Sequence, residues 1–527
     1  DDSSEDVATA RAVGEWAWSN GCLGEMAAML QSDGIGAPYD LGGLYQTILL
    51  YSLTAVVAAF DISPQTLSPD ELESVLIALH SLLRDQFEIC ETFWEQLDPQ
   101  QDSPQPLGVL GPLAGFLSSA RDIFPAAPMP LLSMLSALSQ GSAASVHAYL
   151  YLKSLPALTI LHDSSVLGLV DRSDHARGVV TTASSLQLPW DIFTLPQGVQ
   201  GVVMEVPPVL GPNSPMVAPV GKPLGVGRLL IRWEGNSPGQ MVLVMLAQHA
   251  LDSMAKQPQD VAAAAAAAKL LSATLDLLGQ LLEAEPAVAR DCLTWAWMSP
   301  PPPPGGGRNA RGGRAQPDVL LLLTAAMQRL IALPHPPAND IANCFRIGAA
   351  LASHVPSQVV DCLTASSLLG QHRSGSSAIA WDSPCEASGL PMLTAFQQQV
   401  EARAGQYPAT LRFVQLVEGL IQSGLQHAAM PGFVSHILHS VLATHPGWQY
   451  ANQGDRWCLS GACLRAVRCV LQVVQHDGTA GGHLVAMVTH AFQQEGAFRG
   501  FLLHTTPLGA SSLRSLSLQG THIEAAE

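Results

Sequence analysis

Lysine is scarce in this sequence of 527 residues and occurs only at Lys153, Lys222, Lys256 and Lys269. Lysine and arginine together number 25, against 43 aspartates and glutamates, so the formal net charge is −18. A chain this acidic repels phosphate backbones. We therefore exclude direct nucleic-acid binding as its main function.

The nine cysteines include no C-x-x-C pair, and no apolar leader precedes Asp1. This pattern predicts reduced thiols in a cytosolic or nuclear protein and argues against a disulfide framework. A first residue other than methionine also suggests a fragment. Charged residues make up only 13% of the chain and hydrophobic residues 48%, so we expect most helices to be covered on more than one side.

Apolar residues recur at helical spacing along most of the chain. Ser68-Pro69-Asp70-Glu71 is a capping box with proline at N1, which predicts a helix start. Short breaks rich in proline and glycine suit stacked antiparallel helices, and no strict repeat period is visible. The predicted fold is all-α, an irregular HEAT- or armadillo-like α-solenoid. Its predicted buried stripes are Leu72, Val75, Leu76, Leu79, Leu82 and Leu83; Phe413, Leu416, Val417, Leu420 and Ile421; and Leu464, Val467, Leu471 and Val474.

Two segments depart from the helical pattern. Short strand-like pieces between about 179 and 246 predict a small antiparallel β-barrel inserted between two helices. The low-complexity stretch 299–317 predicts a disordered linker. Its three arginines and neighbouring glycines resemble an RNA-binding RGG segment. Three arginines are few in so acidic a chain, however, and this favours a plain linker. The expected organisation is helices over 1–176, the barrel over 177–247, helices over 248–299, the linker over 300–317 and helices over 318–527.

One apolar run, Leu41 to Phe60, carries no charge and is long enough to cross a bilayer. Four polar residues within it and the lack of a basic flank argue against a membrane span. We predict a buried helix of a large helical protein and no transmembrane segment.

Gly235-Asn236-Ser237-Pro238-Gly239 matches the G-x-S-x-G pattern of a hydrolase nucleophile elbow. In that elbow the backbone N–H of the residue after the serine helps to bind the oxyanion, and Pro238 has no N–H. The loss of one such donor costs about 3 kcal/mol of transition-state stabilisation. The same letters suit a type II turn between two strands, so we predict a turn and no catalytic serine.

Other candidate chemistry is incomplete. His436, His439 and His445 could share one helix, but no H-E-x-x-H motif or cysteine pair completes a zinc site around them. Cys458, Cys463 and Cys469 have the wrong spacing for a zinc knuckle and are expected to pack between helices. The sequence therefore predicts no catalytic residue, no metal site and no cofactor.

The predicted insert carries residues that point to a family. "GVQGVVMEV", followed by "GRLLIRWEGNSPGQMVLVMLAQHAL", resembles the large inner-ring scaffold nucleoporins, in particular the nucleoporin-188 branch with its Src-homology-3-like insert. The stretch from Leu107 to Leu251 carries this resemblance, and the rest of the chain shares only the general character. The matching positions of the barrel are Gly201, Val202, Leu230, Ile231, Arg232, Trp233 and Glu234.

The resemblance implies a non-enzymatic scaffold in the inner ring of the nuclear pore complex, at the nuclear envelope. It implies partners among other nucleoporins, especially short helical motifs of flexible linker nucleoporins of the nucleoporin-93 type. No Phe-Gly dipeptide occurs in the chain, so the likeness is to the framework and not to the permeability barrier. The alternative is a soluble importin-like transport receptor or another helical-repeat adaptor, against which the inserted barrel argues.

Overall fold

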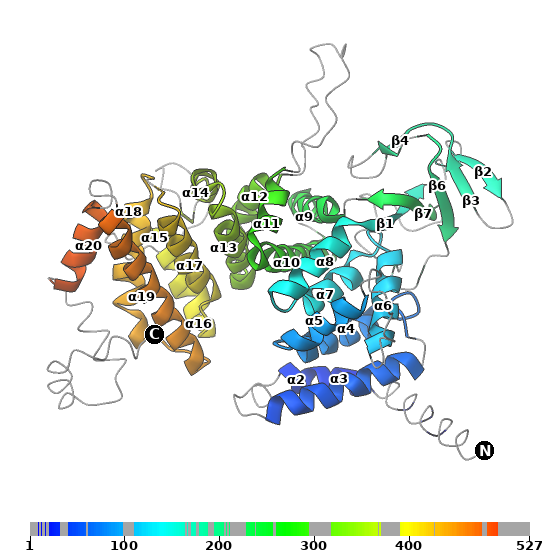
Figure 1. Cartoon of the computed structure of the whole chain (residues 1–527), viewed down its shortest axis with the longest axis horizontal. Coiled ribbons are helices and arrows are strands. Elements are labelled where there is room, and N and C mark those ends of the chain that lie inside the picture. The colour runs from blue at the N-terminus through cyan, green and yellow to red at the C-terminus, as the bar shows by residue number, and fades with distance from the viewer. Residues whose placement is uncertain are drawn as a thin grey trace, which may run out of the picture. The chain divides into compact units, whose positions relative to one another are not determined.

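The structure is a computed structural model of the chain, shown in Figure 1. All structural statements below concern the residues that it describes: 9, 12, 16, 21–31, 41–59, 62–97, 110–163, 166, 170–174, 179–187, 194–195, 197–204, 207, 210, 228–237, 239–256, 260–294, 318–366, 368–369, 390–425, 427–476 and 482–493. The predicted linker 300–317 lies outside them. The described residues form two compact units, one up to residue 288 and one from residue 289.

The first unit is a stack of helices with a small sheet. Within it, α7 packs against both α4 and α10 and buries residues along its whole length. The capping box predicted at Ser68 is confirmed, because the Ser68 hydroxyl accepts from the Glu71 N–H and the Glu71 carboxylate accepts from the Ser68 N–H. The helices are α2 (Cys22–Gln31), α3 (Leu41–Ala59), α4 (Pro69–Leu83), α5 (Phe87–Leu97), α6 (Gly111–Asp122), α7 (Pro128–Leu138), α8 (Ser142–Lys153), α9 (Gly239–Lys256) and α10 (Val261–Ala284).

The second unit is helical throughout its described residues. Its core contains the rings of Phe345, Phe413 and Phe433, packed edge to face across three helices. The predicted stripe after Pro408 is confirmed as buried in α17. After α11 (Pro286–Thr294), which spans the division, come α12 (Val319–Ile331), α13 (Ala338–Ala352), α14 (Pro356–Thr364), α15 (Pro391–Phe396), the π-helical η6 (Gln397–Glu401), α16 (Ala402–Ala404), α17 (Pro408–Gln422), α18 (Met430–Ser435), the π-helical η7 (His436–Leu442), the 3₁₀ turn η8 (His445–Gly447), α19 (Gln453–His476) and α20 (Gly482–Gln493).

The first unit's sheet is small and antiparallel, so a mostly helical fold with a minor β component is confirmed. Five strands pair in the order β1-β7-β6-β3-β2, and β4 pairs with β5 separately. Their bounds are β1 (Leu155–Asp163), β2 (Val170–Asp174), β3 (Val179–Thr182), β4 (Leu186–Gln187), β5 (Thr194–Leu195), β6 (Gln200–Met204) and β7 (Arg228–Ser237).

The sheet begins earlier than the sequence predicts. The first strand starts at Leu155, whereas the expected strands start at about 179 and the expected insert at 177. Four consecutive residues of β1, 157–160, are buried, so both faces of the strand are covered. Such a strand lacks the alternation of apolar and polar residues that identifies half-buried strands, and periodicity alone does not separate it from a buried helix.

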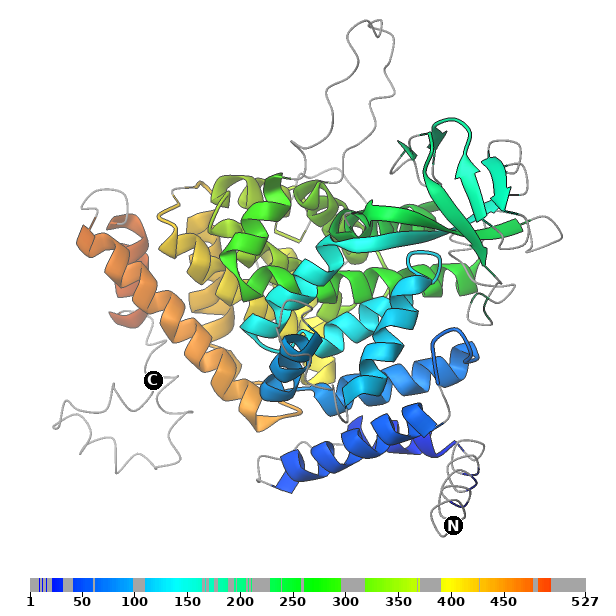
Figure 2. The same ribbon diagram turned by 45° about the vertical axis from the view of Figure 1, so that its right-hand side comes forward.

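The chain enters and leaves the sheet at one place. β1 directly follows α8 and β7 directly precedes α9, and these two strands pair along their length with Leu155 opposite Ser237. Figure 2 shows the two long strands side by side. The helices on either side of the sheet segment are therefore brought together, and α8 contacts α9. This is the arrangement in which an inserted unit leaves a helical stack uninterrupted.

The helix predicted at Leu41 to Phe60 is present as α3 but is buried on one side only. Leu50, Leu53 and Val57 are buried, whereas Ile48 and Tyr51 are 51% and 45% exposed. The helix predicted as buried is therefore buried along one face and exposed along the other. An uncharged helix can keep one apolar face uncovered, because single exposed apolar side chains cost little.

By length and composition, one helix of the described ranges, α10, would be able to cross a membrane. Helices of soluble cores satisfy the same criteria. α10 contacts α7, α8 and α9 within the first unit, and the alanine run near its start strongly favours helix.

Candidate functional site

The residues singled out in the sequence meet on two neighbouring strands. Gly201 and Val202 lie on β6 and the segment from Leu230 to Glu234 lies on β7. The strand register pairs Gly201 with Trp233 and Val202 with Arg232. The two motifs, which lie about thirty residues apart in the sequence, are thus in direct cross-strand contact.

Gly201 makes room for the indole ring of Trp233. A β-carbon on Gly201 would lie 2.7 Å from Cε3 of Trp233 and 2.9 Å from Cγ2 of Ile231. Neither neighbour is a flexible chain end, so any larger residue would force the strands apart. Trp233 and Ile231 are 1% and 0% exposed, and they form the centre of this face of the sheet.

His162 on β1 completes the surroundings of Trp233, and no sequence pattern identifies it beforehand. The indole Nε1–H donates to Nε2 of His162 over 2.9 Å, and the two rings meet edge to face at 5.8 Å. Because Nε2 accepts this hydrogen, His162 is neutral with its proton on Nδ1. Trp233 is therefore held by a hydrogen bond as well as by packing.

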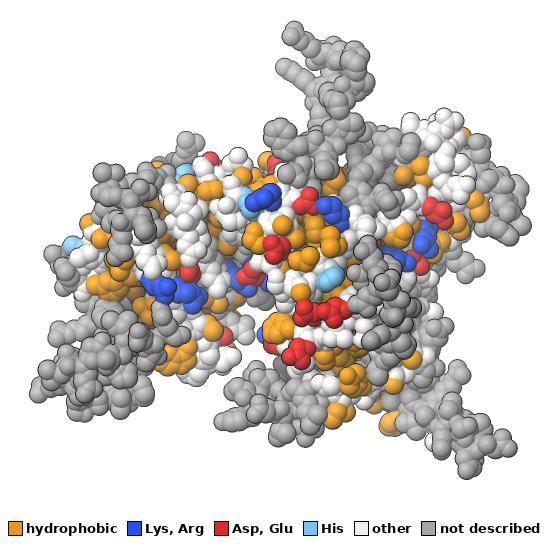
Figure 3. All heavy atoms as spheres, viewed as in Figure 1, with side chains coloured by type: hydrophobic (Ala, Val, Ile, Leu, Met, Phe, Trp, Pro, Cys, Tyr) orange, Lys and Arg blue, Asp and Glu red, His pale blue; other side chains and the backbone are white. Residues whose placement is uncertain are grey.

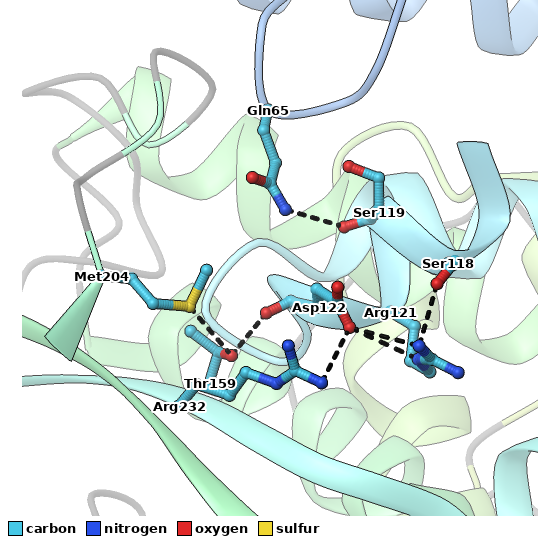
Figure 4. Close-up of polar contacts among 8 residues, drawn as sticks. All are labelled: Gln65, Ser118, Ser119, Arg121, Asp122, Thr159, Met204 and Arg232. Carbon is cyan, nitrogen blue, oxygen red and sulfur yellow. Dashed lines mark hydrogen bonds and ion pairs between the residues drawn. The ribbon is translucent and has the colours of Figure 1, made fainter. Parts of the chain in front are cut away.

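Arg232 joins the sheet to the end of α6. Its guanidinium lies 3.2 Å from Oδ1 of Asp122, which also pairs with Arg121 at 3.4 Å. The hydroxyl of Thr159, the cross-strand neighbour of Arg232, donates to the Asp122 carbonyl over 2.5 Å. Figure 4 shows these groups converging from three segments that are far apart in the sequence.

The loop between α6 and α7 continues this contact along the edge of β1. The Thr159 N–H donates to the Phe124 carbonyl over 2.8 Å, and the Ala126 N–H donates to the Thr159 carbonyl over 3.1 Å. Leu230 is buried on the same side, in a cluster with Ile123, Ala126, Ala127 and Leu210. The sheet is thus fixed to the helices by backbone bonds, by an ion pair and by apolar packing.

The G-x-S-x-G segment has a packing role in this junction. The predicted turn between two strands is wrong, because β7 ends at Ser237 and helix α9 begins at Gly239; Pro238 lies outside the described residues. A β-carbon at Gly239 would lie 2.6 Å from the Leu152 carbonyl oxygen and 2.5 Å from Cδ1 of Leu155. The last glycine of the motif therefore allows α9 to start against the end of α8.

Two of the three histidines considered as metal ligands, His436 and His445, belong to the core of the second unit, whereas His439 is half-buried. His436 is 1% exposed and packs edge to face on Phe413 at 5.7 Å, and His445 is 0% exposed. Burial lowers the pKa of His436 to about 3 and, together with nearby Arg456, that of His445 to about 4. Within the described ranges, no three His, Cys, Asp or Glu residues are grouped as they would be around a metal ion.

A buried carboxylate that the sequence did not reveal lies in the same unit. Glu401 at the end of η6 accepts hydrogen bonds from the N–H groups of Ala409 and Thr410, at 2.8 and 3.2 Å, and from the Thr410 hydroxyl. Tyr407 at the N-cap of α17 makes no side-chain cap bond, so Glu401 satisfies these first N–H groups instead. Burial raises its pKa to about 7.

Two of the three C-terminal cysteines pack between helices as predicted. Cys463 and Cys469 are buried in α19, whereas Cys458 is exposed.

The polar groups at the junction between sheet and helices bond to one another and so connect these elements. The contacts of Asp122 with Arg232 and Thr159 join the sheet to α6.

Comparison with known proteins identifies relatives. A family described as "Nucleoporin Nup188, N-terminal subdomain III" matches residues 315–506. Nucleoporin NUP188 of Xenopus tropicalis is 27% identical over 164 residues, which is 30% of this chain and 9% of that protein. Nucleoporin NUP188 of Mus musculus is 25% identical over 176 residues, 32% of this chain and 10% of that protein. The matched segments thus span about a tenth of the length of these relatives.

The family match falls mainly on the second unit, downstream of the stretch 107–251 that carries the sequence resemblance. Two separate parts of the chain therefore indicate the same family. Both relatives are named as nucleoporins, in agreement with the predicted location at the nuclear pore complex of the nuclear envelope. These findings confirm the resemblance of the chain to the Nup188-type nucleoporins.

Proposed function

We propose that the chain is a structural segment of the inner-ring scaffold of the nuclear pore complex. The observation that carries this proposal is the match of residues 315–506 to a Nup188 subdomain, on a unit built from packed helices. A stack of helices held by many nearest-neighbour contacts provides a long, stiff surface on which partners assemble. We regard the stack as irregular and HEAT-like.

The proposed partners are other nucleoporins, and in particular short helical motifs of flexible linker nucleoporins of the nucleoporin-93 type. Such motifs place an apolar face into a groove between two helices. Exposed apolar side chains on helix faces, such as Ile48 and Tyr51 on α3 and Leu321 on α12, support this mode of binding.

The sheet from β1 to β7 is proposed as an accessory Src-homology-3-like insert, marked by the Gly201 and Trp233 pair. The boundaries that fit its strands are 155 and 237, in place of 177 and 247. Because the two ends of the insert pair with each other, its removal should leave α8 and α9 able to pack.

Calorimetry tests where the linker motifs bind. In the full-length natural protein, residues 156–236 are replaced by a short Gly/Ser linker, and the affinity for a linker-nucleoporin peptide is compared with that of the unchanged protein. We expect equal affinities, because loop closure entropy changes slowly with length and the helices remain. A loss of roughly tenfold or more, about 1.4 kcal/mol, with helical content intact, would assign docking to the insert.

The importin-like alternative predicts different behaviour in cells. A scaffold component gives a stable punctate nuclear rim, whereas a transport receptor gives a mobile pool that exchanges between nucleus and cytoplasm. Photobleaching of the tagged full-length protein distinguishes the two. Rapid recovery at the rim, together with a diffuse pool, would favour the receptor.

We also propose that the chain is not an enzyme and requires no cofactor. The strand-to-helix context of Ser237 suits a nucleophile elbow, but Pro238 cannot donate the hydrogen bond that an oxyanion needs at that position.

A further inference from the structure

Helix α19 in the second unit has an apolar strip that its neighbours leave uncovered. Trp457, Leu464 and Leu471 follow one another at intervals of seven residues along the helix. Trp457 is 53% and Leu471 42% exposed, and Leu464 is half-buried. The sequence predicts Leu464, Val467, Leu471 and Val474 as one buried stripe. The burial of Val474 lies outside the description, and of the other three the structure buries only Val467 fully.

Positive charge borders this strip. Arg465 and Arg468 are both exposed, and Arg456 lies in the first turn. α19 contains three arginines and one acidic residue, Asp455, in a chain whose net charge is −18. Glu418 of α17 pairs with Arg465 at 3.5 Å, yet the Arg465 side chain stays 53% exposed. Figure 3 shows basic side chains, coloured blue, beside hydrophobic ones on this part of the second unit; because this unit contains no lysine, they are arginines.

The spacing and the charge of the α19 strip restrict which kind of partner can bind to it. A seven-residue interval of large apolar side chains is the spacing at which two helices keep contact along a shared seam. Exposed arginines beside such a seam attract carboxylates and repel lysines of an incoming helix, and this selects the partner more than it adds affinity. An exposed tryptophan near arginine also matches the residue types that dominate binding energy in interfaces.

We propose that the α19 strip, formed by Trp457, Leu464, Leu471, Arg465 and Arg468, binds an amphipathic helix of a partner whose apolar seam is bordered by aspartate and glutamate. This inference rests on the proposed scaffold role and names the chemistry of one partner. The exposed face of α3 is also apolar, but it carries no charge, and nothing in the structure specifies its occupant.

The test uses two fluorescent synthetic peptides of about three heptads. Both carry leucine along one seam; one has glutamate and the other lysine at the bordering positions. Fluorescence anisotropy measures their affinity for the whole chain. We expect the glutamate peptide to bind at least tenfold more tightly than the lysine peptide, and we expect the double variant Arg465→Glu and Arg468→Glu to reverse this preference.

The variant Trp457→Ala tests whether the apolar seam contributes to peptide binding in addition to the arginine charges. Because Trp457 is exposed, the variant should fold normally, and we expect it to weaken the glutamate peptide at least tenfold. Leu150→Ala on α8, where Leu150 is 50% exposed, and Arg84→Glu on the first unit, where the Arg84 side chain is 75% exposed, are matched controls that should bind as the unchanged chain does. Circular dichroism checks that all variants retain their helices.

Several results would overturn the inference. These are equal affinity for both peptides, no binding of the glutamate peptide, or no effect of Trp457→Ala. A dimer in sedimentation that Trp457→Ala abolishes would assign the strip to a second copy, and binding of RNA or anionic vesicles that depends on the arginines but not on Trp457 would assign it to phosphate. If the peptides fail to bind but the tagged full-length protein forms a stable nuclear rim, the scaffold role still holds and only the α19 inference is refuted. If the tagged protein forms a mobile pool, the scaffold role itself is refuted.

Discussion

The indole ring of Trp233 lies over Gly201 of the neighbouring strand, at a distance that excludes any β-carbon on that residue. The two positions are separated by 31 intervening residues in the chain, and their contact links the two motifs of the sheet segment. The fit depends on glycine for space alone, because Gly201 is not among the glycines with positive φ.

Gly201→Ala should therefore destabilise the sheet. Overpacking of a filled site costs about 1 to 3 kcal/mol, and we expect faster amide hydrogen exchange in β6 and β7 with unchanged exchange in α12 to α19. Gly115→Ala in α6 is the control, since a β-carbon there meets nothing within 4 Å and alanine favours the helix. Unchanged exchange in Gly201→Ala would show that the strands adapt without cost.

Trp233 should contribute through its ring and through its N–H. Trp233→Ala is expected to cost about 3 to 5 kcal/mol and to release β1, β6 and β7 while the far-ultraviolet helix signal changes little. Trp233→Phe keeps most of the ring but leaves His162 without its indole donor, at a cost of about 1 to 3 kcal/mol. Amide exchange of the sheet measures both; equal effects of the two variants would mean that the hydrogen bond, and not the packing, dominates.

Glu401 should make the stability of the second unit depend on pH. Its pKa is raised from 4.5 to about 7 by burial, so between these values the folded chain binds a proton that the unfolded chain has lost. The free energy of unfolding of this unit should thus fall by a few kcal/mol as pH rises from about 4.5 to 7.

Glu401→Gln removes this titration while keeping an acceptor for the N–H groups of α17. We expect the difference in stability between the natural chain and the variant to change across that pH window, as measured by amide exchange of α17 at several pH values. Glu88→Gln on the exposed face of α5 is the control. A difference that stays constant with pH would show that Glu401 does not titrate there.

His436 should act in the opposite direction. Its pKa is lowered from 6.5 to about 3 by burial, so below pH 6.5 the unfolded chain binds a proton that the folded chain does not. Stability is lost as pH falls through this range, by about 1.4 kcal/mol for each pH unit. His436→Phe, which preserves a ring against Phe413, should shift acid unfolding of the second unit to lower pH; an unshifted midpoint in circular dichroism would contradict this.

Ser237 should be chemically inert. Since Pro238 follows it, we expect no labelling of the chain by a fluorophosphonate probe and no ester hydrolysis above background. Ser237→Ala serves as the matched control. Labelling of the natural chain that this substitution abolishes would require an oxyanion site built from other donors.

Local chemistry explains which parts of the fold were predictable. The start of α4 follows from a capping box whose partners are three residues apart, and the strands β6 and β7 follow from alternation and a resemblance. The missed strand β1 is covered on both faces, so its sequence has no period of two. Which faces of α3 and α19 stay exposed depends on the helices that pack against them. The sequence of one helix alone does not specify those neighbours.

The same distinction applies to the junction. Trp233 and Arg232 were recognisable from their motif, but their partners His162 and Asp122 were not. Strand register and loop position bring these partners into contact, and neither is visible as a spacing along the chain. Glu401 was hidden for the same reason: it caps a helix that begins seven residues later.

Thr159 has a consequence for crowded assemblies. Its N–H and carbonyl, at the middle of the outer strand β1, are both bonded to the α6–α7 loop. An exposed strand edge recruits strands from other molecules and promotes aggregation. A foreign strand would have to displace this loop before it could extend the sheet at β1, so the loop protects that edge wherever many copies of the chain are held close together.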